Sequence, residues 1–469
     1  MKMKVTLGST ITVENPTPEL VSWCKKGLKI SNPDYARKLK MNFWLGNTPP
    51  FLYLYEVRGN TLVLPFGILK DILPLLREKS EYYEGCPVPT MVNFGKDTVP
   101  LYDYQREAVN KMMDAKYGIL QSKAGSGKTQ MGIALVQEYG RKALWLTHTQ
   151  DLLKQSKSRA EMYLDKNLMG TITEGKVNIG KGITFATIQT MCRLNLPEYK
   201  NIWDVVIVDE CHRVAGTPTA MTQFSKVLNS LAARHKFGLS ATVHRSDGMI
   251  KATYALLGRV EYVVPDEAVA DKVMRVGIKP IATDVKMSPD CLNTDGTINY
   301  AKLITYLTEE KSRNCKIVNS IASNRGKPSL ILSDRVKHLE LLLALLPDDM
   351  RQEAVMINGK MVSKTDKELR VKALEDMRTG KKKYLFATYQ LAKEGLDIPC
   401  LERLYMATPQ KDYAIVAQSI GRIARVYDGK QDPICYDFVD DMGYLIKNYK
   451  ARCTTYKKEN CYFVEDENA

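Results

Sequence analysis

The chain has 469 residues, of which 44% are hydrophobic and 26% charged. This length predicts several domains, because single cores stop growing beyond ~250–300 residues, and the composition excludes a disordered, collagen-like or coiled-coil protein. The formal net charge is +15, which is typical of proteins that meet polyanions such as nucleic acid or an anionic membrane surface.

The N-terminal part, residues 1–98, is predicted to be a small α+β domain. We expect a strand at 5–13, a helix over Pro18–Gly27, paired strands within 51–67 that turn at Gly59–Asn60, and a helix over 68–80 that Pro74 interrupts. This domain carries Arg37, Lys38 and Lys40 beside Phe43 and Trp44. Such a cluster could grip a duplex or a fork junction. Alternatively, the two aromatic residues belong to a core and the basic residues form a solvated face.

Two further series of buried strands follow, separated by amphipathic segments. The first comprises 117–120, 143–146, 183–187, 205–208 and 237–240, and the second 329–333, 354–357, 384–388, 403–407 and 434–438. Strands alternating with helices predict α/β domains with parallel sheets, here two in tandem over 99–270 and 271–450. Residues 451–469 form a C-terminal tail. The aperiodic segment 258–296 has three prolines and is predicted to contain the hinge.

Export and metal motifs are missing from the sequence. No apolar run approaches ~18 residues, and the start MKMKVTLGST lacks the apolar core of a signal peptide. The closest of the ten cysteines, Cys453 and Cys461, are eight positions apart, which rules out CxxC zinc spacing. We therefore expect an intracellular, cytoplasmic protein with reduced thiols and no membrane partner.

QSKAGSGKT, residues 121–129, has the pattern of a phosphate-binding loop between a strand and a helix. Its glycines allow the backbone N–H groups of residues 124–127 to close on phosphate oxygens, while Lys128 places a charge on them and the Thr129 hydroxyl can ligate Mg²⁺. Ser122 stands where the strict pattern has its first glycine. The loop residues predicted to bind nucleotide are Ala124, Gly125, Ser126, Gly127, Lys128 and Thr129.

VVIVDECHRV, residues 205–214, ends a buried strand in two acids. Ligands of open α/β sheets bind at the carboxyl edge, so Asp209 is placed to hold the Mg²⁺ that Thr129 also touches, and Glu210 to polarise the attacking water. This pair favours ATP hydrolysis over nucleotide binding alone. Cys211 is predicted to be a packed side chain, because no neighbouring ligands complete a zinc site.

The order of these motifs resembles that of superfamily 2 helicases over residues 100 to 440. The resembling segments are LYDYQREAV, the DECH box, Ser240–Ala241–Thr242, FATYQLAKEGLDIP (386–399) and QSIGRIAR (418–425). The resemblance implies two RecA-like domains that use ATP and Mg²⁺. It assigns Tyr102 and Gln105 to adenine recognition, Asp397 to the nucleotide, and His212, Ser240 and Thr242 to coupling hydrolysis with movement. Gln418, Arg422 and Arg425 would reach the γ-phosphate, with Arg425 as the first choice of arginine finger and Arg422 the second.

The resemblance also places a nucleic-acid track across the two domains. LTHTQDLLKQ (146–155) and FATIQTM (185–191) resemble motifs Ia and Ic. Short hydroxyl and amide side chains, such as those of Thr and Gln, bind a nucleic-acid backbone without reading bases. The predicted contacts are Thr147, Gln150, Thr187, Gln189, Thr388 and Gly395.

Within the superfamily, GLSATVHRSDG (238–248) resembles the LTATPxRxDG motif of the XPB-like branch, with Val243 in place of proline. That branch includes phage UvsW-type branch-migration helicases, and a phage origin would place the protein in the host cytoplasm. The resemblance implies a monomeric ATP-dependent DNA helicase or branch-migration motor acting on single-stranded, forked or branched DNA in replication, recombination or repair. An RNA helicase and a double-strand DNA translocase remain open. A nucleic-acid-binding scaffold with a dead ATPase site and a metal-dependent nuclease are less consistent with the motifs.

Overall fold

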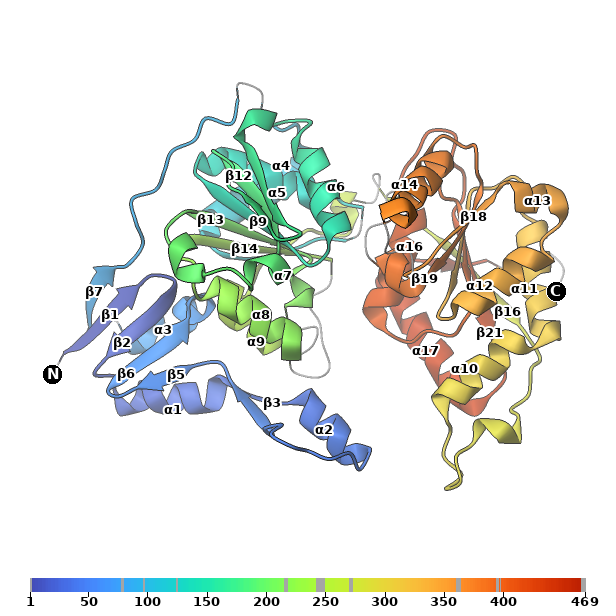
Figure 1. Ribbon diagram of the computed structural model, residues 1–469, viewed down its shortest axis with the longest axis horizontal. Coiled ribbons are helices and arrows are strands. Elements are labelled where there is room, and N and C mark those ends of the chain that lie inside the picture. Colours follow the sequence, from blue (N-terminus) through green and yellow to red (C-terminus); the bar gives the residue numbers. More distant parts are fainter. Residues whose placement is uncertain are drawn as a thin grey trace. The chain divides into compact units, whose positions relative to one another are not determined.

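The computed structural model describes residues 2–76, 80–95, 98–123, 125–214, 218–241, 249–269, 273–359, 364–393, 396 and 398–464. The chain divides into two compact units. The first comprises Met1–Lys123 and Gly127–Ala268, and the second comprises Val269–Ala469 with Ala124–Ser126. Each unit is built around a central sheet flanked by helices (Figure 1).

The main sheet of the first unit has the strand order β11-β10-β12-β9-β13-β14-β8-β15. β10 and β11 pair antiparallel, whereas the other neighbouring strands run parallel. The strands are β8 (Gly118–Gln121), β9 (Ala143–Thr147), β10 (Met169–Thr173), β11 (Lys176–Asn178), β12 (Ile183–Thr187), β13 (Val205–Asp209), β14 (His235–Ser240) and β15 (Val260–Val263).

Helices cover both faces of this sheet, with α4, α5 and α6 on one side and α7, α8 and α9 on the other (Figure 1). They are α4 (Asp103–Ala115), α5 (Lys128–Tyr139), α6 (Gln150–Ala160), α7 (Ile188–Met191), α8 (Pro218–Leu228) and α9 (Ile250–Leu257). Because both faces are covered, β13 is a continuous buried run of β-branched residues rather than an alternating one. Because β12, β9, β13, β14 and β8 run parallel, their carboxyl ends lie side by side at one edge of the sheet.

The second unit has a sheet of parallel strands in the order β18-β19-β17-β20-β21-β16-β22. Its strands are β16 (Gly277–Ala282), β17 (Ser329–Ser333), β18 (Ala354–Ile357), β19 (Tyr384–Thr388), β20 (Arg403–Met406), β21 (Ile434–Val439) and β22 (Tyr462–Phe463). Its helices are α10 (Tyr300–Glu309), α11 (Lys311–Ala322), α12 (Val336–Leu345), α13 (Asp348–Gln352), α14 (Lys364–Arg378), α15 (Tyr389–Lys393), α16 (Tyr413–Ile423) and α17 (Gly443–Lys458). Both units thus confirm the predicted α/β class with parallel sheets.

The N-terminal module of the first unit carries its own sheet, with the order β5-β6-β2-β1-β7. The strands are β1 (Met3–Leu7), β2 (Thr10–Glu14), β5 (Glu56–Arg58), β6 (Thr61–Pro65) and β7 (Ser80–Glu84), and the helices are α1 (Pro18–Gly27) and α3 (Leu69–Leu76). One sheet face buries Val5, Ile11, Val13, Leu62 and Leu64 in a core that also holds side chains of α1 and α3. The opposite face is the polar one.

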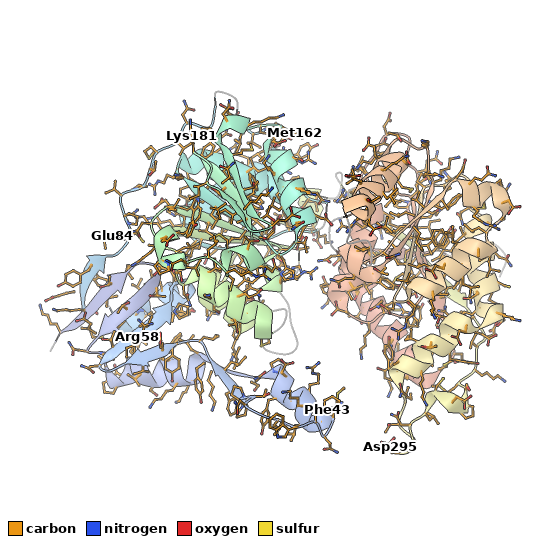
Figure 2. The ribbon with its side chains drawn as sticks, in the orientation of Figure 1. Phe43, Arg58, Glu84, Met162, Lys181 and Asp295 are labelled. Carbon is orange, nitrogen blue, oxygen red and sulfur yellow. The ribbon has the colours of Figure 1, made fainter. Side chains whose placement is uncertain are left out.

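A projection leaves this module between β3 (Lys29–Ser31) and β4 (Phe51–Tyr53), which pair antiparallel. Residues 32–50, called the arm below, comprise α2 (Pro33–Lys40) and the loop after it. In Figures 1 and 2 the arm extends beyond α1, with Phe43 near its far end. The residues at its root pack on the larger domain, since Ile30, Leu52 and Leu54 share an apolar cluster with Met249 and Ala252.

A second joint ties the N-terminal module to the α/β domain. Gly67 lies so close to α9 that a Cβ there would collide with the backbone of Tyr254 and Gly258. The buried Lys236 ammonium, on β14, donates hydrogen bonds to the carbonyls of Ser9 at 3.0 Å and Leu228 at 2.8 Å. The module therefore belongs to the first unit and is not a freely tethered appendage.

The predicted strands of both series coincide with β8, β9, β12, β13, β14 and with β17 to β21, to within two residues at each end. The prediction of a single strand over 5–13 was wrong. The chain reverses at Gly8 and Ser9, where the Gly8 N–H donates to the Thr10 carbonyl, and β1 and β2 form an antiparallel pair. The Pro18–Gly27 helix and the turn at Gly59–Asn60 are confirmed, and Pro74 lies inside α3.

Within the described residues, helices are too short or too polar to span a bilayer. The same residues contain no group of three or more histidine, cysteine or acidic side chains arranged to hold a metal ion.

Candidate nucleotide and nucleic-acid site

The phosphate loop joins β8 to α5 at the carboxyl edge of the first sheet. Gly125 and Gly127 have φ of +88° and +82°, the left-handed region that glycine adopts without strain. Lys128 folds back into the loop, where its ammonium donates to the carbonyls of Ser122 at 3.2 Å and Lys123 at 3.3 Å. An anion in the loop would meet this ammonium and the N-terminus of α5 together.

Gln105 closes one side of the loop. The Gln105 amide lies against Gly127, where a Cβ would displace it, and the positive φ of Gly127 independently favours glycine. The Gln105 Oε1 accepts a hydrogen bond from the Tyr102 N–H at 3.0 Å, and its Nε2 donates to the Tyr104 hydroxyl at 3.3 Å. Tyr102 is exposed and stacks on Tyr104. This arrangement suits recognition of a flat heterocycle next to the loop.

Asp209 and Glu210 follow β13 at the same edge. The Asp209 carboxylate is buried and accepts hydrogen bonds from the Ser156 hydroxyl at 3.1 Å and the Glu210 N–H at 3.0 Å. Burial, and then the neighbouring Glu210 carboxylate, raise the pKa of Asp209 to about 6, while the Lys128 charge acts in the opposite direction. A buried carboxyl group beside a second one fits a divalent cation, which would stabilise its ionised form.

Glu210 has φ of +50°, an uncommon conformation for a residue with a side chain. His212 Nδ1 lies 3.2 Å from the Glu210 carboxylate and 3.1 Å from the Ser240 hydroxyl. Ser240 ends β14, and its backbone carbonyl accepts a hydrogen bond from the N–H of Ser122 in the phosphate loop. His212 thus contacts Ser240, one of the coupling residues that the sequence grouped with it. Cys211 is fully buried against Gly238.

Sequence reasoning missed Ser156, which holds the Asp209 carboxylate from α6. The helical pattern could have indicated Ser156 as a buried residue, because Leu153, Ser156 and Ala160 form the buried face of α6. A serine at an otherwise apolar helix position needs a hydrogen-bond partner.

In the second unit, Gln418 and Arg422 lie on α16 and Arg425 lies just after it. Gln418 Oε1 is buried and has no hydrogen-bond partner among the described residues, which fits contact with a ligand or water. The Arg422 guanidinium donates to the carbonyls of Ala392 at 3.0 Å and Leu396 at 2.9 Å. Arg425 is half-buried, and its backbone forms a bridge with Val273.

The predicted nucleic-acid contacts have unequal exposure. Thr147 and Thr187 are buried at strand ends, and their hydroxyls donate to the Thr149 carbonyl and to the Thr190 hydroxyl, each at 3.0 Å. Gln150, Gln189 and Thr388 are half-exposed.

The Gln189 amide donates to the His148 carbonyl at 2.8 Å. Thr129 is half-exposed next to Lys128. Four predicted site residues, Ala124, Thr242, Gly395 and Asp397, lie outside the described residues.

Two family descriptions match the chain. Residues 98–245 match "Type III restriction enzyme, res subunit", and residues 311–427 match "Helicase conserved C-terminal domain". The matched ranges contain the phosphate loop and DECH box in the first unit and the QSIGRIAR segment in the second.

Two curated relatives cover most of the chain. The mimivirus protein L396 of Acanthamoeba polyphaga mimivirus, whose name describes an ATP-dependent RNA helicase, is 26% identical over 87% of this chain and 76% of its own length. The DNA 3'-5' translocase XPB2 of Sulfurisphaera tokodaii is 24% identical over 73% of this chain and 81% of its own length.

Among solved structures, S. cerevisiae Dbp5 bound to RNA and ADP BeF3 aligns with 86% of this chain and 94% of its own. The TM-score is 0.54 at 16% identity, which supports the tandem RecA-like fold.

Proposed function

Because the chain belongs to the superfamily 2 helicases and is similar to their XPB-like branch, it is an ATP-hydrolysing helicase, and we propose that its substrate is forked or junction DNA. In this proposal ATP hydrolysis drives unwinding or branch migration during replication, recombination or repair. The name of the XPB2 relative, a DNA translocase, supports DNA as the track.

The first unit supplies the hydrolytic side chains of this proposal. Lys128 binds the phosphates and Gln105 reads the base, with Tyr102 beside it. Thr129 and Asp209 hold Mg²⁺, which when bound neutralises charge on the phosphates. Glu210 orients and polarises the attacking water, and its contact with His212 links that step to Ser240.

The second unit supplies Gln418 and Arg425 to the γ-phosphate, and Asp397 to the nucleotide. Arg425 remains the first choice of arginine finger, and the Arg422 guanidinium, which binds two backbone carbonyls, the second. The track is assigned to Gln150, Gln189, Thr388 and Gly395, and the buried Thr147 and Thr187 are assigned to shaping it.

The observation that carries the choice of a junction is the arm, residues 32–50. Its apolar side chains point outward: Leu39 is 58% exposed, Met41 57%, Phe43 62% and Trp44 88%. The alternative that Phe43 and Trp44 belong to a core is therefore wrong. Leaving side chains of this size in water forgoes about 1.5–3 kcal/mol each, which indicates that a partner covers them.

Polar contacts, rather than apolar packing, hold the arm in shape. The buried Asn32 donates from its side chain to the Pro49 carbonyl at 2.8 Å and from its backbone to the Pro50 carbonyl at 3.0 Å. The Lys38 ammonium donates to the Thr48 hydroxyl at 2.7 Å. The aromatic residues are consequently not needed for the fold of the arm.

The chemistry of the arm suits unpaired bases beside a phosphate backbone. Arg37, Lys38 and Lys40 provide cations against the single acid Asp34, which pairs with Arg37 at 3.1 Å. Base stacking on an aromatic ring is worth about 1–3 kcal/mol per base and does not depend on sequence. Such a tip is suited to the point where a duplex opens.

The test combines a Phe43→Ala/Trp44→Ala variant with ATPase and unwinding assays on single-stranded, duplex, forked and four-way DNA and on RNA. We expect fork unwinding to fall by at least ~10-fold, which corresponds to removing the stacking of one base. The ATPase activity that single-stranded DNA stimulates should be unchanged, because the variant leaves the nucleotide site intact. Val88→Ala, at a 90% exposed position away from the arm, is the matched control.

Three outcomes contradict the proposal. Stimulation by RNA alone makes the protein an RNA helicase, as the name of L396 describes that relative. Stimulation by duplex DNA without strand separation makes it a double-strand translocase. Unwinding by the double variant at the rate of the Val88→Ala control removes the arm from the reaction.

A further inference from the structure

A groove of about 1040 Å³ runs between the N-terminal sheet and α8 of the larger domain. Lys200 and Ser230 mark its far wall, near the amino ends of β13 and β14. The phosphate loop and Asp209 lie at the carboxyl ends of the same sheet. The groove is therefore separate from the nucleotide site.

Strand alternation lines the sheet side of the groove with threonines. Thr6, Thr10, Thr12 and Thr61 lie on the face opposite the apolar core, and Thr6 is the register partner of Thr12. These four hydroxyls make no hydrogen bond to other described residues, whereas all are only half-exposed. They form a wall of hydrogen-bonding groups without partners in the part of the chain that the structure describes.

The facing wall is polar and basic. α8 and the turn after it contribute Ser225, Lys226 and Asn229, and Lys200 extends the wall. Lys226 donates to the Cys192 carbonyl at 2.9 Å, while the exposed Lys200 ammonium makes no hydrogen bond to another described residue.

The charge of the groove is positive. Its cations are Lys200, Lys226 and Arg58, and its acid, Glu56, pairs with Arg58 at 2.6 Å. Another acid on the same sheet, Glu81, lies outside the lining and pairs with Lys2. The two lysines on the helix side are therefore not neutralised by a carboxylate in the lining.

The groove is continuous with the root of the arm. Leu52, Tyr53, Leu54 and Tyr55 line its near end, and the Tyr53 ring is 58% exposed and meets Tyr55 edge to face at 6.0 Å. An aromatic ring beside hydroxyls and lysines is the combination found in single-strand binding surfaces. A strand leaving the arm would meet this end first.

We propose that the groove binds the sugar-phosphate backbone of one unpaired strand of the junction, as a contact additional to the motor track. Hydroxyl, amide and lysine groups bind phosphate and sugar without reading sequence. The groove volume lies at the upper end of the ~300–1,000 Å³ range of small-molecule sites, and its lining of hydroxyl, amide and lysine groups favours a length of polymer backbone. The inference rests on the proposed function, because a strand reaches the groove only from a junction engaged by the arm.

The test is a Lys200→Glu/Lys226→Glu variant of the full chain, with Lys111→Glu/Lys181→Glu as a control of equal charge change on exposed positions away from the groove. Fluorescence anisotropy measures the Kd of forks with single-stranded DNA or RNA tails at several salt concentrations. We expect fork affinity to fall at least ~10-fold, and the slope of log K against log salt to decrease in magnitude by about 1.4, or about 0.7 for each phosphate that the variant no longer neutralises. The control variant should keep the wild-type slope of log K against log salt. In the groove variant, the kcat of ATP hydrolysis with a short oligonucleotide should not change.

Unchanged affinity and slope in the groove variant overturn the inference, and so does an equal loss of affinity in the control, which would reflect net charge alone. If forked or single-stranded DNA stimulates the wild-type ATPase in either case, the proposed function stands while the groove does not. A wild-type enzyme that no nucleic acid stimulates refutes the proposed function itself. The tail that supports tighter binding identifies the strand as DNA or RNA.

Discussion

Two arginines three positions apart in QSIGRIAR have different surroundings. Arg422 donates to the carbonyls of Ala392 and Leu396 and so holds the segment after β19 against α16. Arg425 follows the helix, next to a backbone bridge with Val273. At the residue scale these contacts separate a positioning arginine from a candidate arginine finger.

We expect Arg425→Ala to lower the kcat of ATP hydrolysis by about 10³-fold with little change in unfolding temperature, as for removal of a finger that stabilises the transition state. Arg422→Ala should instead destabilise the protein by about 1–3 kcal/mol, because two carbonyls lose a charged donor. Steady-state ATPase and thermal unfolding, measured on both variants, separate these effects. A stable Arg422→Ala protein with the larger decrease in kcat would reverse the two assignments.

Lys236 is the second residue whose surroundings decide its behaviour. It is fully buried on β14, where its ammonium binds two carbonyls and, among the described residues, no carboxylate. Burial lowers the pKa of Lys236 from 10.5 to about 7. The folded protein therefore releases this proton at a lower pH than the unfolded chain does.

Between pH 7 and 10 the unfolded chain binds more protons at Lys236 than the folded one, so this group makes stability rise with pH. We expect the free energy of unfolding of the wild type, relative to Lys236→Met, to increase by up to about 1.4 kcal/mol per pH unit in this range. Urea unfolding at pH 7.5 and 9 measures the difference. The free energy of unfolding of Lys111→Met, a change at an exposed position, should vary with pH as that of the wild type does. The prediction is refuted if the free energy of unfolding of Lys236→Met also varies with pH in parallel with the wild type.

At the element scale, the turn Phe66–Ile68 lies directly against α9 and joins the N-terminal module to the larger domain. The salt bridge between Arg259 and Asp71, at 2.9 Å, crosses the same joint. The approach is close enough that Gly67 leaves no room for a side chain. Backbone packing, more than the exposed ion pair, therefore sets the position of the module.

Gly67→Ala should force the two elements apart and cost about 1–3 kcal/mol or more, as overpacking does in cores. The expected signs are a lower unfolding temperature and faster proteolysis within residues 1–98, measured on the full chain. Gly443→Ala is the control, because its Cβ meets no atom and alanine favours the start of α17. Equal stability of the two variants would show that the joint adapts.

At the scale of the whole molecule, one chain holds every group that the proposed reaction needs. Lys128 and the two acids lie in the first unit, Gln418 and Arg425 in the second, and the arm projects from the N-terminal module. No second copy has to complete the nucleotide site. The proposal is accordingly a monomeric motor.

We expect fork-stimulated ATPase activity per chain to be independent of protein concentration, and sedimentation equilibrium to give the mass of one chain, 53.0 kDa, without nucleic acid. An activity that rises steeply with protein concentration, together with a larger mass, would indicate an obligate oligomer.

The sequence by itself determined the two α/β cores and predicted where the nucleotide binds. A strand covered on both faces must be a continuous apolar run, as in VVIVD, and a phosphate loop needs glycines and a lysine within a few positions, so both signals are local. Strand β10 was missed because its residues are less apolar than those of the predicted strands, and it forms by pairing with β12.

Only the tertiary structure decided which side chains face solvent or partners far away in the chain. The sequence left open whether Phe43 and Trp44 belong to a core, and the arm holds them outward because its own contacts are polar. Ser156 reaches Asp209, and Arg422 reaches Ala392, across long stretches of chain. The groove exists only because Gly67 and Lys236 bring a threonine face against α8, and no local pattern encodes that approach.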